Sequence, residues 1–362
     1  MRWLRAGFLP VSVLILLTAV LIVPLPFYLE RPGTAVSLGA CVDVDSDGRG
    51  VDGDFLLTTI NVSPATAFDA VRGIVDDETS LVPRRQLLPP GVESEEFFSR
   101  QRELFAASAD VAAGVGLEAA GYEVTVSGEG VQVVRILPGT PAAELLRPGD
   151  VIRSIDGNAV AVEADLREVI EDTEVGTPLR LQVQRDGEVL DVDVAPRLVQ
   201  GMSVIGILPQ TLHPRVDLPV DVEVATGPFG GPSAGLMIAL TVYDKVRSDV
   251  DLAAGRIVAG TGSISQDGRV GPIGGVGLKV LAAEARGADV FLAPAADYPA
   301  AIGAVPAGSD LQIVSVETFD EARDAQLETI GEISRTGGAQ GEACPYRKEG
   351  QAGGDRTAVR AP

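Results

Sequence analysis

The hydroxyl of Ser233 and the amine of Lys279 are the two groups in this chain whose types and settings best suit nucleophilic catalysis. Ser233 lies in residues 230–236 (GGPSAGL), and Lys279 ends a second glycine-rich stretch, residues 271–279 (GPIGGVGLK). A serine hydroxyl is a weak nucleophile unless a nearby base takes its proton. The 362-residue chain contains one histidine and three lysines, so each candidate base can be considered in turn.

Lys279 is the base that this comparison favours. Lys245 follows Ser233 on one predicted helix, about 18 Å further along the axis at 1.5 Å per residue. Lys348 lies in a tail rich in glycine and arginine, without an apolar pattern to anchor it. His213 offers the alternative of a Ser-His-Asp triad, but its proline-rich neighbourhood is more typical of a surface loop. We therefore predict a Ser233–Lys279 dyad.

The neighbours of the dyad suit the same chemistry. Gly231 allows backbone angles that other residues resist, and Pro232 fixes the turn before Ser233. We expect Ser233 at a helix N-terminus, where free N–H groups, including its own, would form an oxyanion hole. To act as a base, Lys279 must lose roughly three units from its usual pKa, and burial among apolar residues lowers it. Thr261, after a predicted strand, is placed to hydrogen-bond the amine.

Composition and charge exclude several function classes. The formal net charge of −22 argues against nucleic acid, because binding it requires Lys and Arg to neutralise phosphates. Aromatic residues make up 4% of the chain, too few to predict a base-stacking surface. No lysine follows the glycine spacing of a Walker A loop, so we expect neither ATP nor any other cofactor.

A group of aspartates matches the spacing of a calcium-binding loop. Asp43, Asp45 and Asp47 precede Gly48, and Asp54 occupies the twelfth position. The flanks are strand-like and the twelfth residue is Asp rather than Glu, so we favour a solvated hairpin turn and predict no metal site. Calcium titration would decide between the two interpretations.

The N-terminus carries a membrane signal. Residues 6–29 contain no charged side chain and include a strongly apolar run, long enough to cross the roughly 30 Å hydrocarbon layer as a helix. Arg2 and Arg5 precede it, which favours a cytoplasmic N-terminus. A cleaved signal peptide is the alternative, but no small-x-small site follows the run, so we favour an uncleaved single-pass anchor. Residues after the anchor would then lie outside the cytoplasm, where Cys41 and Cys344 could pair or stay as two thiols.

Composition and the predicted pattern of helices and strands divide the chain into five segments of an α+β multidomain protein. Residues 1–30 form the cytoplasmic tip and transmembrane helix, and residues 31–120 form a juxtamembrane β-hairpin and helical segment. Residues 121–199 alternate short strands and turns around one helix. Residues 200–330 alternate strands and helices in an α/β pattern, and residues 331–362 have the composition of a disordered tail.

The segment 121–199 resembles a bacterial PDZ domain. The resemblance is carried by residues 137–143 (LPGTPAA), 147–152 (RPGDVI) and 155–157 (IDG). It implies a small β-barrel with helices that captures an extended peptide by strand addition. The corresponding carboxylate-binding loop would be residues 121–124, where Glu123 would repel a terminal carboxylate. Substrate docking and a passive spacer both remain open.

The segment 200–330 resembles the proteolytic domain of Lon proteases. Four motifs occur in order: residues 231–235 (GPSAG), 261–264 (TGSI), 268–275 (GRVGPIGG) and then Lys279. The resemblance implies that Ser233 and Lys279 form the catalytic dyad and that Thr261 supports the lysine. Gly230 stands where Lon enzymes often have an acidic residue, so a substrate-polarising role is absent here.

Together these features predict an ATP-independent serine endopeptidase on the outer face of a bacterial membrane. Gly231 and Pro232 would shape the turn that holds the oxyanion, and the PDZ domain would present protein or peptide substrates that are already extended. The alternative is an inactive Lon-like and PDZ scaffold that binds peptide tails without cleaving them. The sequence leaves the oligomeric state open, with a homo-oligomer as one alternative.

Overall fold

The computed structural model describes residues 24–45, 53–75, 78–88, 92–137, 139–199, 202–225, 227–332 and 344–346. The part of the predicted membrane helix up to residue 23 therefore lies outside the described residues. Its predicted extension to Leu29 is wrong, because Pro24–Ser37 form strand β1. Pro24 and Pro26 lack the N–H that a helix interior needs, and the following residues pair with a neighbouring strand instead. None of the helices within the described ranges has the length and apolar character to cross a membrane.

The chain forms two compact units, and the second is inserted into the first. The first unit contains residues 1–121 and 220–362, and the second contains residues 122–219. These units differ from the predicted segments, because residues 31–120 and 200–330 were expected to be separate. The difference arises because strands from both segments belong to one sheet.

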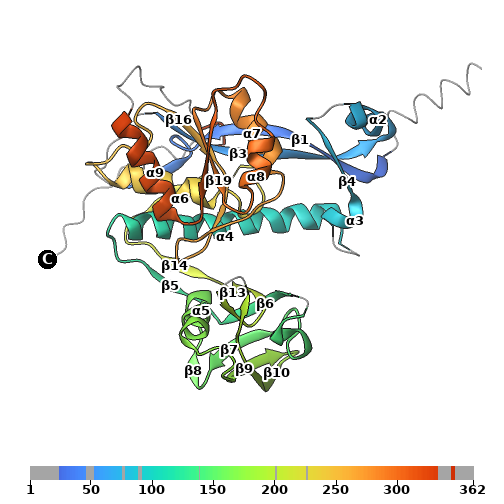
Figure 1. Cartoon of the computed structure of the whole chain (residues 1–362), viewed down its shortest axis with the longest axis vertical. Coiled ribbons are helices and arrows are strands. Elements are labelled where there is room, and N and C mark those ends of the chain that lie inside the picture. Colours follow the sequence, from blue (N-terminus) through green and yellow to red (C-terminus); the bar gives the residue numbers. More distant parts are fainter. Residues whose placement is uncertain are drawn as a thin grey trace, which may run out of the picture. The chain divides into compact units, whose positions relative to one another are not determined.

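The sheet of the first unit has six strands (Figure 1). Their spatial order is β20 (Gln312–Val316), β19 (Val290–Pro294), β16 (Ile257–Gly260), β3 (Asp54–Thr66), β1 and β4 (Ser80–Pro83). The first four run parallel, whereas β1 pairs antiparallel with both β3 and β4. Parallel strands are usually covered on both faces, and β19 is buried along its whole length. The hairpin predicted over residues 35–62 is confirmed only in part, because β3 covers its second strand, whereas its first strand, residues 36–44, overlaps β1 only as far as Ser37 and residues 42–44 pair elsewhere.

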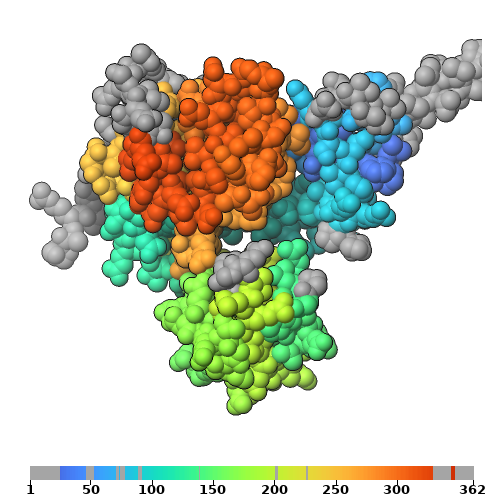
Figure 2. All heavy atoms as spheres, viewed as in Figure 1, coloured from blue at the N-terminus to red at the C-terminus, as the bar shows by residue number. Residues whose placement is uncertain are grey.

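Helices from distant parts of the sequence cover this sheet. They are α2 (Ala67–Val75), α3 (Arg84–Leu87), α4 (Ser94–Ala119), α6 (Gly235–Val246), α7 (Val276–Ala285), α8 (Tyr298–Gly303) and α9 (Phe319–Glu332). The nearly all-apolar α6 is buried because α4 packs along it. Gly116 permits this close approach, since an added Cβ would lie 2.5 Å from the Ala239 carbonyl oxygen. In Figure 2, N-terminal residues (blue and cyan) and residues of the C-terminal part (orange) lie side by side on this unit, consistent with the packing of α7 on β1.

Two short strand pairs and a disulfide complete the first unit. Strand β2 (Val42–Val44) pairs with β15 (Val222–Val224), and β17 (Ser263–Ile264) pairs with β18 (Val270–Gly271). Cys41 and Cys344 form a disulfide with a Cα–Cα distance of 5.0 Å. The sequence leaves open whether these cysteines pair or stay as two thiols, and in the structure they pair.

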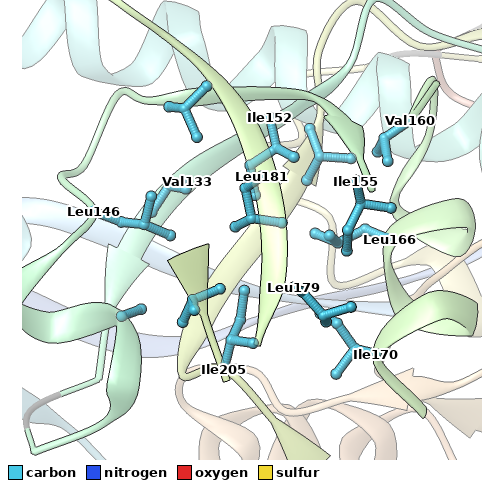
Figure 3. Close-up of a cluster of buried hydrophobic side chains, with 14 residues drawn as sticks. Val133, Leu146, Ile152, Ile155, Val160, Leu166, Ile170, Leu179, Leu181 and Ile205 are labelled. Atoms are coloured by element: carbon cyan, nitrogen blue, oxygen red, sulfur yellow. The ribbon is translucent and has the colours of Figure 1, made fainter. Parts of the chain in front are cut away.

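The second unit is a small sheet closed by one main helix. The sheet order is β10 (Glu188–Val194), β9 (Leu179–Arg185), β7 (Val151–Ile155), β6 (Val131–Ile136) and β13 (Ile207–Thr211), with β8 (Asn158–Ala159) paired to β7. Apolar side chains from the strands meet Leu166 and Ile170 of α5 (Glu163–Asp172), as Figure 3 shows. The sequence predicts strands over residues 131–137, 179–184 and 188–194 and a helix over 163–171, which agree closely with β6, β9, β10 and α5.

Shorter elements flank this sheet. They are η1 (Pro141–Glu144) and the strand pairs of β5 (Thr125–Ser127) with β14 (Arg215–Asp217) and of β11 (Arg197–Val199) with β12 (Met202–Val204).

Candidate active site

Ser233 lies in a tight turn between β15 and α6. Gly231 adopts a left-handed backbone conformation with φ 79°, which a side chain would strain. Its N–H donates to the Gln101 carbonyl oxygen of α4 at 2.8 Å, so the turn is held against that helix. Pro232 follows, and its carbonyl oxygen accepts from the Gly235 N–H at 3.2 Å. The half-buried Ser233 therefore stands two residues before the first residue of α6.

Lys279 reaches Ser233 from the first turns of α7. This helix begins after Gly275, a left-handed N-cap with φ 66°. The lysine side chain is only 3% exposed, and its Nζ donates to the Ser233 Oγ at 2.8 Å. The glycine-rich stretch and the serine turn, far apart in sequence, thus bring the predicted pair into hydrogen-bonding contact.

Thr261 links the two catalytic candidates. Lys279 Nζ donates to Thr261 Oγ1 at 2.9 Å, and Thr261 Oγ1 donates to the Ser233 carbonyl oxygen at 3.0 Å. The same carbonyl oxygen accepts from the Gly262 N–H at 2.9 Å. Thr261 itself follows β16 directly and is held by a bond from its N–H to the Leu292 carbonyl oxygen. The residues that follow the inner strand β16 therefore bind both the serine and the amine.

Burial lowers the pKa of Lys279 from 10.5 to about 8. The main cause is desolvation, which disfavours the ammonium, and the negative charge of Asp297 acts weakly in the opposite direction. At pH 7, one unit below this pKa, about a tenth of the chains therefore carries the neutral amine, the form that can accept a proton.

The hydrogen bonds also orient the lone pair of that neutral amine. The single proton of the Thr261 hydroxyl is used on the Ser233 carbonyl oxygen, so Thr261 can only accept from the lysine. A neutral amine that donates one N–H to Thr261 can turn its lone pair toward Ser233. The 2.8 Å separation then suits transfer of the serine proton to Nζ.

The first N–H groups of α6 do not form the oxyanion hole that we predicted. The Leu236 N–H donates to the Gly262 carbonyl oxygen at 3.1 Å, and the Gly235 N–H donates to Pro232. These bonds occupy the helix end because β16 and the serine turn pack directly onto it. The N–H of Ser233 remains the predicted donor to a substrate oxygen.

The other candidates from the sequence lie elsewhere. His213 is exposed in the second unit and hydrogen-bonds Glu129 at 3.0 Å. The buried Asp54 accepts from the Ser37 hydroxyl at 2.6 Å, and Asp43 belongs to β2. Asp47 lies outside the described residues. Across the described ranges, which include Asp43, Asp45 and Asp54, no group of three or more His, Cys, Asp or Glu side chains is arranged to hold a metal ion.

Two residues of the site were not predicted. Gln101 supports the serine turn from α4, and nothing in its sequence surroundings indicates this contact. Asp297 accepts from the Ile273 N–H at 2.8 Å and places a carboxylate close enough to affect the lysine. Its position just before Tyr298 and Pro299 is typical of a residue that begins a helix, here α8, and this signal could have drawn attention to it.

Comparisons with known proteins match both units. A model described as the Lon protease (S16) C-terminal proteolytic domain matches residues 187–329, and a model described as a PDZ domain matches residues 114–195. The Lon match contains Ser233, Thr261 and Lys279.

Curated relatives match shorter stretches. A Lon protease of Campylobacter concisus is 33% identical over 112 residues, covering 30% of this chain and 14% of the relative. The magnetosome formation protease MamE of Paramagnetospirillum magneticum is 33% identical over 116 residues, covering 31% and 15%. Lon protease 2 of Bacillus subtilis is 29% identical over 126 residues, covering 35% and 21%. This chain thus spans about a fifth or less of the length of each of these relatives.

Among solved structures, the PDZ domain of an SdrC-like protein from Listeria monocytogenes is 28% identical. The alignment covers 24% of this chain and 92% of that chain, with a TM-score of 0.22.

Proposed function

We propose that this chain, which carries a PDZ domain and a Lon-type proteolytic domain, is a serine endopeptidase that uses a Ser233–Lys279 dyad and no ATP. The observation that carries the proposal is the 2.8 Å contact between Lys279 Nζ and Ser233 Oγ, made by a lysine that is almost fully buried. A nucleophile and a base within hydrogen-bond reach, with the base oriented by a third group, is the arrangement that covalent catalysis requires.

The acylation step follows from these positions. Neutral Lys279 takes the Ser233 proton as Oγ attacks the carbonyl carbon of the substrate peptide bond. The N–H of Ser233 stabilises the resulting oxyanion, and the lysine ammonium then gives its proton to the leaving amine. Cleavage of the C–N bond leaves an ester between Ser233 and the N-terminal part of the substrate.

The deacylation step uses the same groups in reverse. Lys279 is again neutral after the amine has left, so it accepts a proton from an attacking water. Collapse of the second tetrahedral intermediate returns that proton to Ser233 Oγ and releases the carboxyl product. Thr261 keeps the amine aligned through both halves because it holds one N–H throughout.

Independence from ATP is part of the proposal because the sequence has no lysine at the Walker A spacing. The proposed activity of these 362 residues would not itself pull a folded substrate apart. We therefore infer that the substrates are extended, unfolded or locally loose segments of proteins. Capture of such a segment by the PDZ domain would raise its concentration near the site.

We further propose that the protease acts outside the cytoplasm. The disulfide between Cys41 and Cys344 supports this location, because such bonds persist in oxidising compartments and are rare in the cytosol. An N-terminal membrane anchor over the apolar residues that precede β1 stays a prediction from the sequence. A homo-oligomer likewise stays one alternative for the assembly.

The proposal is tested by comparing exported and membrane proteins in cells that carry the wild type or the Ser233→Ala variant. A protease leaves at least one uncut precursor when Ser233 is replaced. Ser248→Ala, which changes an exposed serine of the same unit, serves as the matched control and is expected to behave as wild type. Identical protein patterns in all three strains would instead favour the scaffold alternative.

A further inference from the structure

A short segment near position 345 lies against the loop that precedes Ser233, far from its place in the sequence. We name residues 344–346 (Cys344, Pro345 and Tyr346) the strap. The disulfide from Cys344 to Cys41 joins positions 303 residues apart and fixes the strap to the first unit. Cys41 also accepts, through its carbonyl oxygen, a 2.8 Å bond from the Ala225 N–H, just before the loop that leads to Ser233.

Tyr346 packs directly on that loop. Its ring meets the ring of Phe229 edge-on with centroids 4.9 Å apart, and Phe229 in turn packs on Phe105 of α4 at 5.5 Å. Phe229 and Phe105 are buried. The tyrosine ring also covers Gly227 so closely that an added Cβ would lie 2.6 Å from it. The aromatic row thus connects the strap, the loop and α4.

The loop is held from its other side by α4. The Gly231 N–H donates to the Gln101 carbonyl oxygen at 2.8 Å, and an added Cβ on Gly230 would lie 3.0 Å from the Gln101 Cβ. Residues 227–231 contain no helix or strand of their own. Their position depends on these contacts with α4 and the strap, and they lead directly into Ser233, whose carbonyl oxygen is also held by Thr261 and Gly262.

The strap also borders the helix that carries Lys279. Pro345 and Tyr346 line a pocket of about 400 Å³ together with residues 33–37 of β1, with Ala282 and Ala285 of α7 and with Arg286, which follows α7. One three-residue segment therefore adjoins both elements whose spacing sets the distance between Ser233 Oγ and Lys279 Nζ.

We propose that the strap positions the catalytic serine, with Tyr346 as the positioning residue, and that the Cys41–Cys344 bond makes the activity dependent on oxidation. This inference rests on the proposed function for its effect on rate. Reduction of the disulfide to two thiols by a dithiol reductant, which is itself oxidised, frees the strap. Tyr346 then leaves the loop, and Ser233 is no longer held at bonding distance from Lys279.

The first test replaces the ring. Tyr346→Ala is expected to lower kcat for a peptide substrate by about 10- to 100-fold with KM nearly unchanged, because a small misplacement of a reacting group has effects of this size. Tyr346→Phe keeps the edge-on ring contact and is expected to stay within about twofold of wild type. Phe68→Ala removes an exposed aromatic ring of the same unit and serves as the control for general loss of an aromatic side chain.

The second test breaks the bond without touching the ring. A reductant is expected to lower the wild-type rate to that of the Cys41→Ser/Cys344→Ser double variant, and reoxidation is expected to restore it. The double variant should not respond to the reductant. Wild-type kcat in Tyr346→Ala, or in the reduced protein, would overturn the proposal.

A third readout separates this inference from the proposed function. Hydrogen exchange of the amides in residues 227–236 is expected to be faster in Tyr346→Ala and in the reduced protein than in oxidised wild type, whether or not the protein cleaves peptides. If the wild type cleaves no peptide but exchange is still faster in Tyr346→Ala and in the reduced protein, the positioning role is retained and the peptidase is removed. Unchanged exchange would remove the positioning role.

Discussion

Asp150 in the PDZ unit and Lys279 in the protease unit are both almost fully buried, yet Asp150 is hydrogen-bonded to an oppositely charged side chain and Lys279 to uncharged hydroxyls. Asp150 is 1% exposed and accepts two 2.7 Å bonds from the guanidinium of Arg185. Burial alone would raise the pKa of Asp150, but the bonds from Arg185 and from the Arg147 N–H lower it below its usual value. Lys279 is 3% exposed, and its described hydrogen-bond partners are the hydroxyls of Ser233 and Thr261.

The difference shows how the surroundings decide whether a buried group stays charged or can lose its charge near neutral pH. A matched counter-charge keeps Asp150 ionised, and the pair then fixes a turn of the PDZ unit. Hydroxyl partners satisfy the hydrogen bonds of Lys279 without compensating its charge, so desolvation lowers its pKa to about 8. Only the second arrangement leaves a group that exchanges a proton near physiological pH.

The largest expected effect comes from restoring a permanent charge at position 279. Lys279→Arg is expected to reduce the phosphonylation of Ser233 by a fluorophosphonate probe, in which fluoride is displaced from phosphorus, by at least about 1,000-fold, because a guanidinium stays protonated and cannot act as a base. The folded state should be retained, as checked by circular dichroism. Labelling of this variant at the wild-type rate would remove Lys279 from the mechanism.

A smaller loss is expected when the hydroxyl that orients the amine is removed. Thr261→Val has nearly the same shape but can neither accept from Nζ nor donate to the Ser233 carbonyl oxygen. We expect kcat to fall by about 10- to 100-fold. Thr261→Ser keeps the hydroxyl and is the matched control. Equal rates for the valine and serine variants would show that the orienting bond has no role.

The rate should also depend on pH with the sign of a depressed lysine pKa. The neutral amine is the active form, so kcat/KM is expected to rise about tenfold per pH unit below pH 8 and to level off above it. A profile that falls as the pH rises toward 8 would contradict the role of Lys279.

The free energy of unfolding should also depend on the titration of Lys279. The folded pKa is about 8 and the unfolded value about 10.5, so between these pH values the unfolded chain binds more protons. The penalty for burying the ammonium, about 3 kcal/mol from this difference, is therefore complete below pH 8 and is relieved as the pH rises to 10.5. The gap in unfolding free energy between wild type and the uncharged Lys279→Met variant should shrink across that window.

The smallest effect on activity is expected from the structural pair. Asp150→Asn leaves the Arg185 guanidinium without its counter-charge and is expected to destabilise the PDZ unit by about 2 kcal/mol, measured by denaturant unfolding. Probe labelling of Ser233 should stay within about twofold of wild type, because Ser233 belongs to the other unit. A large loss of labelling would show that the two buried groups are coupled.

The sequence was sufficient to find the candidate catalytic groups and not the segments that hold them. Ser233, Thr261 and Lys279, which are joined by hydrogen bonds in the structure, could be singled out because glycine-rich turns and the scarcity of lysine mark them locally. Helix α6 and the strands of the PDZ unit could be predicted because their apolar patterns are regular. The start of α6 was nearly correct, but the use of its first N–H groups was not, since their acceptors lie in residues 232 and 262.

The contacts that the sequence did not reveal are those between distant segments. Strands β1 and β3 join the protease sheet beside β16, although some 190 residues separate β3 from β16. The support of the serine turn by Gln101 likewise depends on a helix that precedes the inserted PDZ unit. Parallel strand pairing and helix packing leave no local signature that names the partner, so neither contact could be predicted from one sequence.

The most direct test of the account is a titration of Lys279 itself. The chain has only three lysines, so protein with isotope-labelled lysine gives few side-chain NMR signals, and the one absent from Lys279→Arg is that of Lys279. The account predicts that this signal titrates with a midpoint near 8. A midpoint at or above about 10, the value of a lysine in water, would contradict the claim that burial makes this amine a base.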